Sequence, residues 1–335
     1  MLVAWRARTD LGSSRNYPSV FANGEGMRLF GAAPFDTATV VYAKYCDGGS
    51  WTGALSNPPR VVGNATVYYR GRGLLEGLFD ELFTRRGLDA AAEVLWAGCS
   101  AGGLTAYLHA DWVAAQVRAR GAPGARVVGL ADAMFSLDHD DLGGDGHWPA
   151  FMRWVYNNMD PTGASGNEDC VREMAARHGS PPGNRSEGWR CMFGAAVAPY
   201  VQTPMFVLNS KYDTWQGKQI IGAAAYPGCA DNIASAQCPA NVKAFWAAYG
   251  RSMVAALDAL PPRHGVYLHN CPSHCQTGLP TWDTDGVNGT SMGAAVAVWY
   301  TLAMRGRGAQ EFAPRHIDRC DVTPCAGDVC NGQPT

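Results

Sequence analysis

Ser100 lies in the sequence GCSAG at 98–102, which fits the G-x-S-x-G pattern of the nucleophile elbow in serine hydrolases. In such an elbow the serine hydroxyl attacks an ester carbonyl, and the N–H of the next residue, here Ala101, binds the developing oxyanion. An apolar run at 94–98 precedes Ser100, and a helix pattern at 104–118 follows it. This strand–turn–helix context is the one that the elbow requires, so we predict that Ser100 is a nucleophile.

A second match to the pattern, GTSMG at 289–293, contains Ser291. No predicted strand leads into it, and either Thr290 or Ser291 is a good N-cap for the helix pattern that follows. The string is similar to the nucleophile region of subtilisin-like proteases, but their order requires Asp and His motifs ahead of the serine, and we find neither. We therefore interpret Ser291 as a helix cap.

A nucleophilic serine needs a histidine base and an acid that orients the histidine. In the α/β-hydrolase order the acid follows a later strand and the histidine follows the last one. The run at 204–209 leads into SKYDTWQG and offers Asp213, and the run at 265–270 leads into NCPSHCQTG and offers His274. Because the carboxyl ends of parallel strands meet at one edge of a sheet, we expect Ser100, Asp213 and His274 to lie together. The alternatives are a turn-forming aspartate and a structural loop histidine.

The elements that must position these residues alternate between strands and helices. The predicted strands are 39–46, 94–98, 127–132, 204–209 and 265–270, and the predicted helices are 74–86, 104–118, 242–260 and 291–304. Strands that alternate with amphipathic helices predict a mostly parallel sheet with helices on both faces. Two other histidines are weaker candidates for the base, because His269 lies inside the last predicted strand and His109 in mid-helix. We expect one domain over 1–335.

The region 143–200 breaks this alternation and is rich in Trp, Asn, Gly and Pro. We expect it to be an insertion over the carboxyl edge of the sheet, where open α/β sheets bind ligands; the alternative is an inert surface excursion. The nearby sequence DHDDLGGDGH at 138–147 is acidic, but it lacks the ligand spacing of a calcium-binding EF-hand loop. We interpret it as a solvated loop and predict no metal.

The composition excludes several classes of protein. The chain has 335 residues, of which 47% are hydrophobic and 17% charged, which predicts a folded protein with a sizeable core. Its formal net charge of −2 gives no basic surface for a nucleic acid. The sequence has no apolar run of about 18 residues, so we expect no membrane span.

The 11 cysteines indicate disulfides, since no zinc-binding Cys-x2-Cys spacing occurs. We predict short-range pairs for Cys170/Cys191, Cys229/Cys238 and Cys271/Cys275, and a tail at 306–335 that contains Cys320, Cys325 and Cys330. Disulfides imply an oxidising compartment, and the N-x-[ST] sequons at Asn64, Asn184 and Asn288 agree with secretion. The first residues contain no apolar signal-peptide core, so we expect that the natural N-terminus, with its leader, is missing. The odd number of cysteines agrees with this expectation.

Several separated motifs resemble those of the pectin acetylesterase family, which includes the animal carboxylesterase Notum. They are LGSS at 11–14, YCDGGS at 45–50, YYRGRG at 68–73, GCSAGG at 98–103, YDTWQ at 212–216, NCPSHCQT at 270–277 and a three-cysteine tail. The resemblance covers nearly the whole chain. It implies an α/β-hydrolase fold and a secreted carboxylesterase, with Ser100 as nucleophile, Asp213 as acid and His274 as base, and no cofactor.

The sequence departs from the family at its start. Family members carry a GGGWC-type stretch whose N–H groups help to form the oxyanion hole, and this chain begins after it. The resemblance therefore implies a truncated chain without the first strands and one side of that hole, and it leaves open whether the chain alone is active. The cysteine of that stretch is the expected partner of Cys46, and Cys99 is expected to be a buried free thiol.

We therefore expect a serine esterase that removes O-acetyl groups from an extracellular or cell-wall polysaccharide. One alternative is a protein deacylase that accepts longer acyl chains, as in Notum. The other alternative is a non-catalytic glycan-binding protein on an esterase scaffold, in which some of the 11 tryptophans stack on sugars.

Overall fold

The fold is built on a five-stranded parallel sheet. The computed structural model describes residues 28–44, 46–62, 64–159, 166–181, 183–222, 226, 228–229, 233, 235–306, 313–321 and 330. The sheet has the order β3-β4-β5-β6-β9. Its strands are β3 (Glu93–Cys99), β4 (Arg126–Asp132), β5 (Met205–Ser210), β6 (Gly265–His269) and β9 (Arg315–Ile317). Two small antiparallel pairs, β1 (Arg60–Val62) with β2 (Ala65–Val67) and β7 (Gly286–Val287) with β8 (Thr290–Ser291), lie outside it.

Apolar side chains project from both faces of the sheet into the core, which explains why its strands are continuous apolar runs. Along β5, Phe206 and Leu208 pack in the core under α9 (Met292–Arg305), while Met205 and Val207 pack in the core on the opposite face. All six residues of β5 are buried, as is typical of a central strand covered on both sides. By contrast, β3 is an edge strand of the described sheet and its residues are only partly buried.

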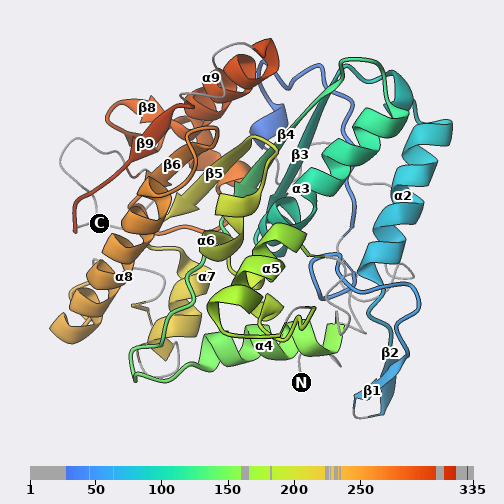
Figure 1. The fold of residues 1–335 in the computed structure, drawn as a ribbon. Helices are drawn as coiled ribbons and strands as arrows, with labels where there is room; N and C mark the ends of the chain where they lie inside the picture. Colours follow the sequence, from blue (N-terminus) through green and yellow to red (C-terminus); the bar gives the residue numbers. More distant parts are fainter. Residues whose placement is uncertain are drawn as a thin grey trace.

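The helices cover the two faces (Figure 1). The helices α3 (Ala101–Arg120) and α8 (Ala240–Asp258) pack on one face, α9 packs on the other, and α2 (Gly71–Arg85) packs against α3 and β3. The other α-helices of the described residues are α4 (His147–Met159), α5 (Glu168–Arg177), α6 (Gly194–Val197) and α7 (Thr214–Gly217). The predicted class, a mostly parallel sheet with helices on both faces, is confirmed and agrees with an α/β-hydrolase-like fold.

Four of the five predicted strands are confirmed as β3, β4, β5 and β6. The prediction of a buried strand at 39–46 is wrong for its described residues, which form no strand. Val40, Val41 and Tyr42 are 47%, 52% and 60% exposed. Strand propensity alone does not make a buried strand, because such a strand also needs a face to bury against the core. The strand β9, which pairs in parallel with β6 through only three residues, was not predicted from the sequence.

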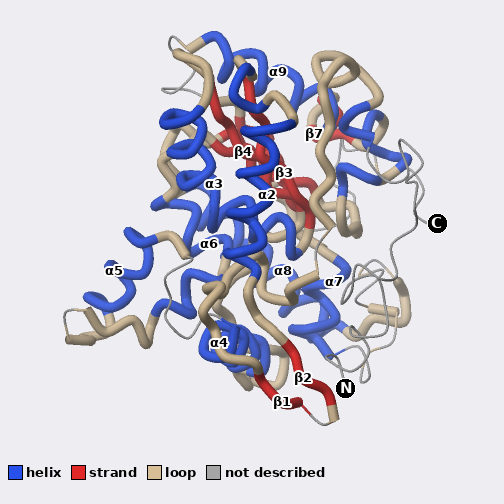
Figure 2. Tube along the Cα trace, turned by 90° about the vertical axis from the view of Figure 1, so that its right-hand side faces the viewer, coloured by secondary structure: helices blue, strands red, loops and turns tan. Residues whose placement is uncertain are grey.

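The region 143–200 contributes α4, α5 and α6 and contains the predicted Cys170–Cys191 disulfide. In both views α4 lies at the same end of the molecule as the β1–β2 pair (Figures 1 and 2). The backbone of α4 is fixed there in part by Asn57, whose side-chain amide donates to the carbonyl of Met159. Among the described helices, none combines the length and apolarity that crossing a bilayer requires.

Candidate active site

Ser100 occupies a sharp turn between β3 and α3. Its backbone has φ 57° and ψ −121°, in a region that residues with a side chain rarely adopt. Small neighbours permit this turn, since a Cβ on Gly98 would lie 2.4 Å from the Gly102 carbonyl oxygen and one on Gly103 would lie 2.5 Å from that of Asp132. Strained backbone of this kind exposes the serine hydroxyl at the end of a strand. The N–H of Ala101 follows in the first turn of α3, where amide donors have no acceptor within the helix.

Asp213 and His274 are in direct contact. Nδ1 of His274 lies 2.8 Å from Oδ2 of Asp213, whose side chain is 1% exposed. The other carboxylate oxygen, Oδ1, accepts from the N–H groups of Trp215 (3.1 Å) and Gln216 (2.8 Å), so Asp213 also caps α7. An ionised carboxylate only accepts hydrogen bonds, so Nδ1 carries the proton and Nε2 of His274 is left free to act as a base.

A disulfide joins the elbow to the loop of the histidine. Cys99 precedes Ser100, Cys275 follows His274, and the two cysteines are bonded to each other. A ring nitrogen of His274 lies within 4.8 Å of both sulfur atoms. The structure therefore places His274 beside the elbow, although no hydrogen bond between the Ser100 hydroxyl and the His274 ring is present among the described residues. In proteins without a bound substrate such contacts are often longer than in the reacting complex.

Two cysteine predictions are wrong. Cys99 is disulfide-bonded and is not a free thiol, and Cys275 pairs with it rather than with Cys271. Cys271 pairs with Cys330 of the tail, 59 positions later in the sequence. Spacing misleads here because the loop after β6 folds back onto the elbow, which brings cysteines that are distant in sequence within bonding range. The predicted Cys229–Cys238 pair is confirmed, whereas the LGSS motif at 11–14 and Cys325 lie outside the described residues.

Asp132, at the carboxyl end of β4, was not identified from the sequence. Its carbonyl oxygen accepts from the N–H of Ser100 at 2.9 Å. Its carboxylate accepts from the N–H of Gln276 at 3.2 Å and from the N–H and hydroxyl of Thr277 at 2.8 and 2.7 Å. Burial raises the pKa of Asp132 to about 6, against the opposing effect of these hydrogen bonds and of nearby His274. One buried residue thus holds both the elbow and the loop that carries His274.

The other sequence candidates have structural roles. The hydroxyl of Ser291 accepts from the N–H of Ala294 at 3.2 Å, which confirms that Ser291 is the N-cap of α9. His109 and His269 are fully or almost fully buried, and burial lowers the pKa of each to about 3, so both are neutral. The three sequon asparagines, Asn64, Asn184 and Asn288, are exposed.

The acidic loop before α4 brings Asp141, Asp145 and His147 together, with possible ligand atoms within 4.8 Å of one another. The Asp141 carboxylate is already used, since it accepts from the N–H groups of Gly143 and Asp145 and lies 2.5 Å from Nδ1 of His147. These contacts within the loop explain why the three side chains lie close together.

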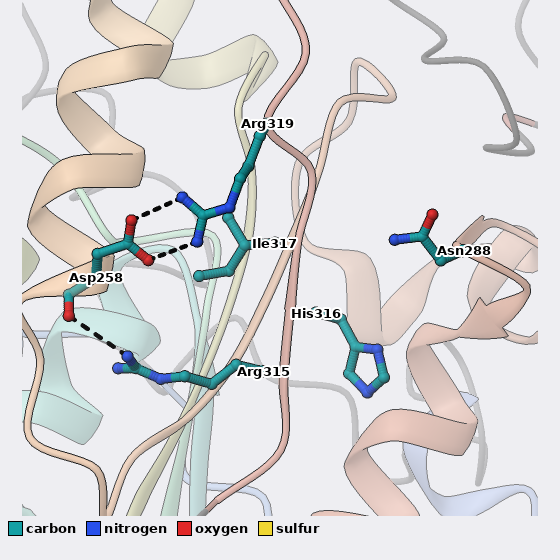
Figure 3. A pocket seen from close by; sticks show the side chains of 6 residues that line it. All are labelled: Asp258, Asn288, Arg315, His316, Ile317 and Arg319. Atoms are coloured by element: carbon teal, nitrogen blue, oxygen red, sulfur yellow. Dashed lines mark hydrogen bonds and ion pairs between the residues drawn. The ribbon is translucent and has the colours of Figure 1, made fainter.

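A surface pocket along the edge strand β9 is separate from these residues (Figure 3). It is lined by Asp258, Asn288, Arg315, His316, Ile317 and Arg319. Its carboxylate, Asp258, is held by both terminal nitrogens of Arg319, at 2.7 and 2.8 Å. None of the lining residues belongs to the Ser100, Asp213 and His274 group, and the pocket offers no nucleophile and base in contact.

A family model described as Pectinacetylesterase matches residues 3–329. The chain is 28% identical to pectin acetylesterase 11 of Arabidopsis thaliana over 279 residues. This alignment covers 78% of this chain and 64% of that protein. It is 28% identical over 313 residues to pectin acetylesterase 5 of the same plant, covering 88% and 67%. To the Homo sapiens palmitoleoyl-protein carboxylesterase NOTUM it is 27% identical over 274 residues, covering 78% and 48%. The chain thus spans about half to two thirds of the length of these relatives.

Proposed function

The chain belongs to the pectinacetylesterase family, and we propose on that premise that it is a serine carboxylesterase that removes O-acetyl groups from an extracellular, pectin-like polysaccharide. The observation that carries this proposal is the 2.8 Å contact between His274 and the buried carboxylate of Asp213, beside an elbow that holds Ser100 at φ 57°. Hydrolases that use a Ser-His-Asp triad on a nucleophile elbow place a paired base and acid next to such a serine.

In the proposed reaction, the Oγ atom of Ser100 attacks the carbonyl carbon of the acetyl ester, and Nε2 of His274 accepts the hydroxyl proton. Asp213 keeps the proton on Nδ1 and stabilises the imidazolium that forms. The N–H of Ala101 donates to the oxyanion, aided by the positive end of α3. The C–O bond to the sugar breaks as His274 returns the proton to the sugar oxygen. Water then attacks the acetyl-enzyme by the same route and releases acetate and free Ser100.

The substrate and the compartment follow from the relatives and from the disulfides. The plant relatives are named for the removal of acetyl groups from pectin. Four disulfides among the described residues support an oxidising compartment, so we infer a secreted or cell-wall protein. We also infer that the region 143–200 shapes the opening of the site, because Trp148 of α4 packs against Trp215, whose ring lies beside His274.

Covalent labelling with a fluorophosphonate, mapped by peptide mass spectrometry, tests the nucleophile, and acetate release from acetylated pectin tests the reaction. We expect label on Ser100, acetate release from the wild-type protein, and neither from Ser100→Ala. The matched control is Ser291→Ala, which removes the other G-x-S-x-G serine and should keep both signals. Label on another serine, or acetate release by Ser100→Ala, would contradict the assignment. Binding of pectin without acetate release would favour a glycan-binding protein instead.

A second candidate function is the removal of a longer acyl chain, because relatives named as palmitoleoyl-protein carboxylesterases cover part of the same chain. The two activities differ in the size of the acyl group that the site accepts. Comparing kcat/KM for 4-nitrophenyl acetate and 4-nitrophenyl octanoate separates them. A preference for the octanoyl ester would overturn the acetyl assignment while leaving the serine mechanism in place.

A further inference from the structure

A row of aromatic side chains leads from the candidate base to the surface of α4. The ring centre of Trp215 lies 6.2 Å from that of His274, and the ring centres of Trp148 and Trp215 are 5.0 Å apart. Trp148 then stacks on Phe151 at 5.6 Å, and Phe151 stacks on Trp154 at 6.5 Å, with interplanar angles of 20° and 18°. We call Trp215, Trp148, Phe151 and Trp154 the aromatic row. Successive ring centres along it, starting from His274, lie 5.0–6.5 Å apart.

The outer half of the row is exposed although α4 has a well-formed buried face. Trp148 is 5% exposed, whereas Phe151 and Trp154 are 42% and 43% exposed. The buried face of the same helix consists of Trp148, Pro149, Met152, Val155, Tyr156 and Met159. Phe151 and Trp154 are three positions apart, which places them as neighbours on the outer face of the helix. Two large rings that are stacked in solvent beside a site are typical of a surface that binds a partner.

Within α4, Arg153 is the one lysine, arginine or acidic side chain, while the acidic loop at 138–147 precedes the helix. Arg153, next to Trp154 in the sequence, is exposed, and its guanidinium lies 5.8 Å from the centre of the Trp189 ring. Within the described part of the chain no carboxylate forms an ion pair with Arg153, whereas Arg190, over the same ring, is paired with Asp138 and Glu187.

We propose that the aromatic row is a binding subsite for an acidic polysaccharide, which it directs towards Ser100. The proposal rests on the proposed function. The C–H faces of successive sugar rings would stack on the parallel planes of Phe151 and Trp154, and a uronate carboxylate would pair with Arg153. An acyl chain fits this surface poorly, because a lipid needs an enclosed apolar pocket and the two outer rings are open to water.

The double variant Phe151→Ala/Trp154→Ala tests the row. We expect kcat/KM on acetylated polygalacturonate to fall about tenfold more than kcat/KM on 4-nitrophenyl acetate, mainly through KM, because the small ester does not reach α4. The matched control is Val298→Ala/Leu302→Ala, which removes two exposed apolar side chains, 54% and 38% exposed, one turn apart on α9. This control should leave kcat/KM unchanged on both acetylated polygalacturonate and 4-nitrophenyl acetate. Equal losses on both substrates would overturn the proposal, as would a loss confined to 4-nitrophenyl octanoate.

Arg153→Gln tests the charge. We expect a higher KM for acetylated polygalacturonate that carries no methyl esters, whose carboxylates are free. We expect little change for the same acetylated polymer with methyl-esterified carboxyl groups, which has the same sugars without the charge. The effect should shrink as salt is raised. An equal change on both polymers would overturn the role of Arg153.

Binding can be measured apart from catalysis, so failure of the esterase assignment and failure of this proposal are distinguishable. The test compares Ser100→Ala with Ser100→Ala/Phe151→Ala/Trp154→Ala by affinity electrophoresis in gels that contain acetylated polygalacturonate. We expect retardation of the first protein and a clear loss of retardation in the second. Equal mobility of the two proteins would overturn the proposal whether or not the wild-type protein releases acetate.

Discussion

Asp132 and Thr277 form a two-point contact: the Asp132 carboxylate accepts both the N–H and the hydroxyl of Thr277, at 2.8 and 2.7 Å. Thr277 lies three residues after His274, and the carbonyl of Asp132 accepts the N–H of Ser100. The end of β4 is therefore the common support of the two loops that carry the nucleophile and the base. Neither loop could shift without breaking a hydrogen bond to this one buried residue.

Asp132→Asn should lower kcat by about tenfold or more, because an amide group cannot accept all of these hydrogen bonds and a buried unpaired donor costs about 1–3 kcal/mol. The rate of fluorophosphonate labelling of Ser100 should fall in parallel. The matched control is Asp111→Asn. Asp111 likewise accepts the N–H and the hydroxyl of a threonine, Thr203, but on a different loop. This control should lower the melting temperature and leave the labelling rate of the folded protein unchanged. Equal labelling rates in the two variants would contradict a positioning role for Asp132.

The pKa of Asp132 also predicts how stability depends on pH. Burial raises this pKa to about 6, above the ordinary value, so the folded state binds the proton more tightly than the unfolded state. The stabilisation is fully present below about pH 4 and is lost as the pH rises through about 6. A difference of about 2 pKa units corresponds to about 3 kcal/mol. Urea unfolding at pH 4, 5, 6 and 7 should show this decline in the wild-type protein and a flatter profile in Asp132→Asn.

Asp258→Asn provides a control of opposite sign for that experiment. The hydrogen bonds from Arg319 lower the pKa of Asp258. The stabilisation from that carboxylate is therefore present above its ordinary pKa and lost as the pH falls. Because this loss occurs only below about pH 4, the series is extended down to about pH 2, where the wild-type protein should lose stability relative to Asp258→Asn. Parallel profiles for the wild type and Asp132→Asn would contradict the raised pKa of Asp132.

The positions of Ser100, Asp213 and His274 were predictable because each follows an apolar run that ends at the same edge of the sheet. The hydrogen bond between Asp213 and His274 agrees with that expectation, while the catalytic roles remain predictions. Asp132 was overlooked because it ends the run VVGLAD, where it resembles any polar residue that terminates a strand. Its role depends on Gln276 and Thr277, which are more than 140 positions away.

The disulfides and the edge strands were less predictable for a related reason. Cys99 and Cys275 are 176 positions apart, and spacing alone does not determine pairing among many cysteines. The strand β9 has only three residues and is recognisable only beside β6. The run at 39–46 has the composition of a strand, but its described residues form none. Long-range contacts decided these cases, and local patterns do not encode them.

The Cys99–Cys275 disulfide should be needed for activity more than disulfides elsewhere. A loop of this length gives an entropic stabilisation of about 5 kcal/mol in the chain-entropy treatment. The bond also fixes the residue before Ser100 to the residue after His274. Cys99→Ser/Cys275→Ser should lower both the melting temperature and kcat.

In the control Cys229→Ser/Cys238→Ser, the lost bond closes a short loop, since the two cysteines are only 9 positions apart in the sequence. That control should lower the melting temperature and retain kcat of the folded protein. Retained kcat in the first variant would show that the bond serves stability alone.

Asp213→Asn separates the two roles of Asp213. Asparagine can still accept the N–H groups of Trp215 and Gln216 and cap α7, because Asn and Asp are comparable N-caps. It cannot hold a proton on Nδ1 of His274 or stabilise the imidazolium, so kcat should fall by about 10³–10⁴ with little loss of stability. Asp213→Ala removes the cap as well and should lose about 1 kcal/mol of stability in addition. The measurement is kcat for acetate release beside urea unfolding of the three proteins. A loss of activity in Asp213→Ala that is absent from Asp213→Asn would make Asp213 a structural cap and remove the acid from the mechanism.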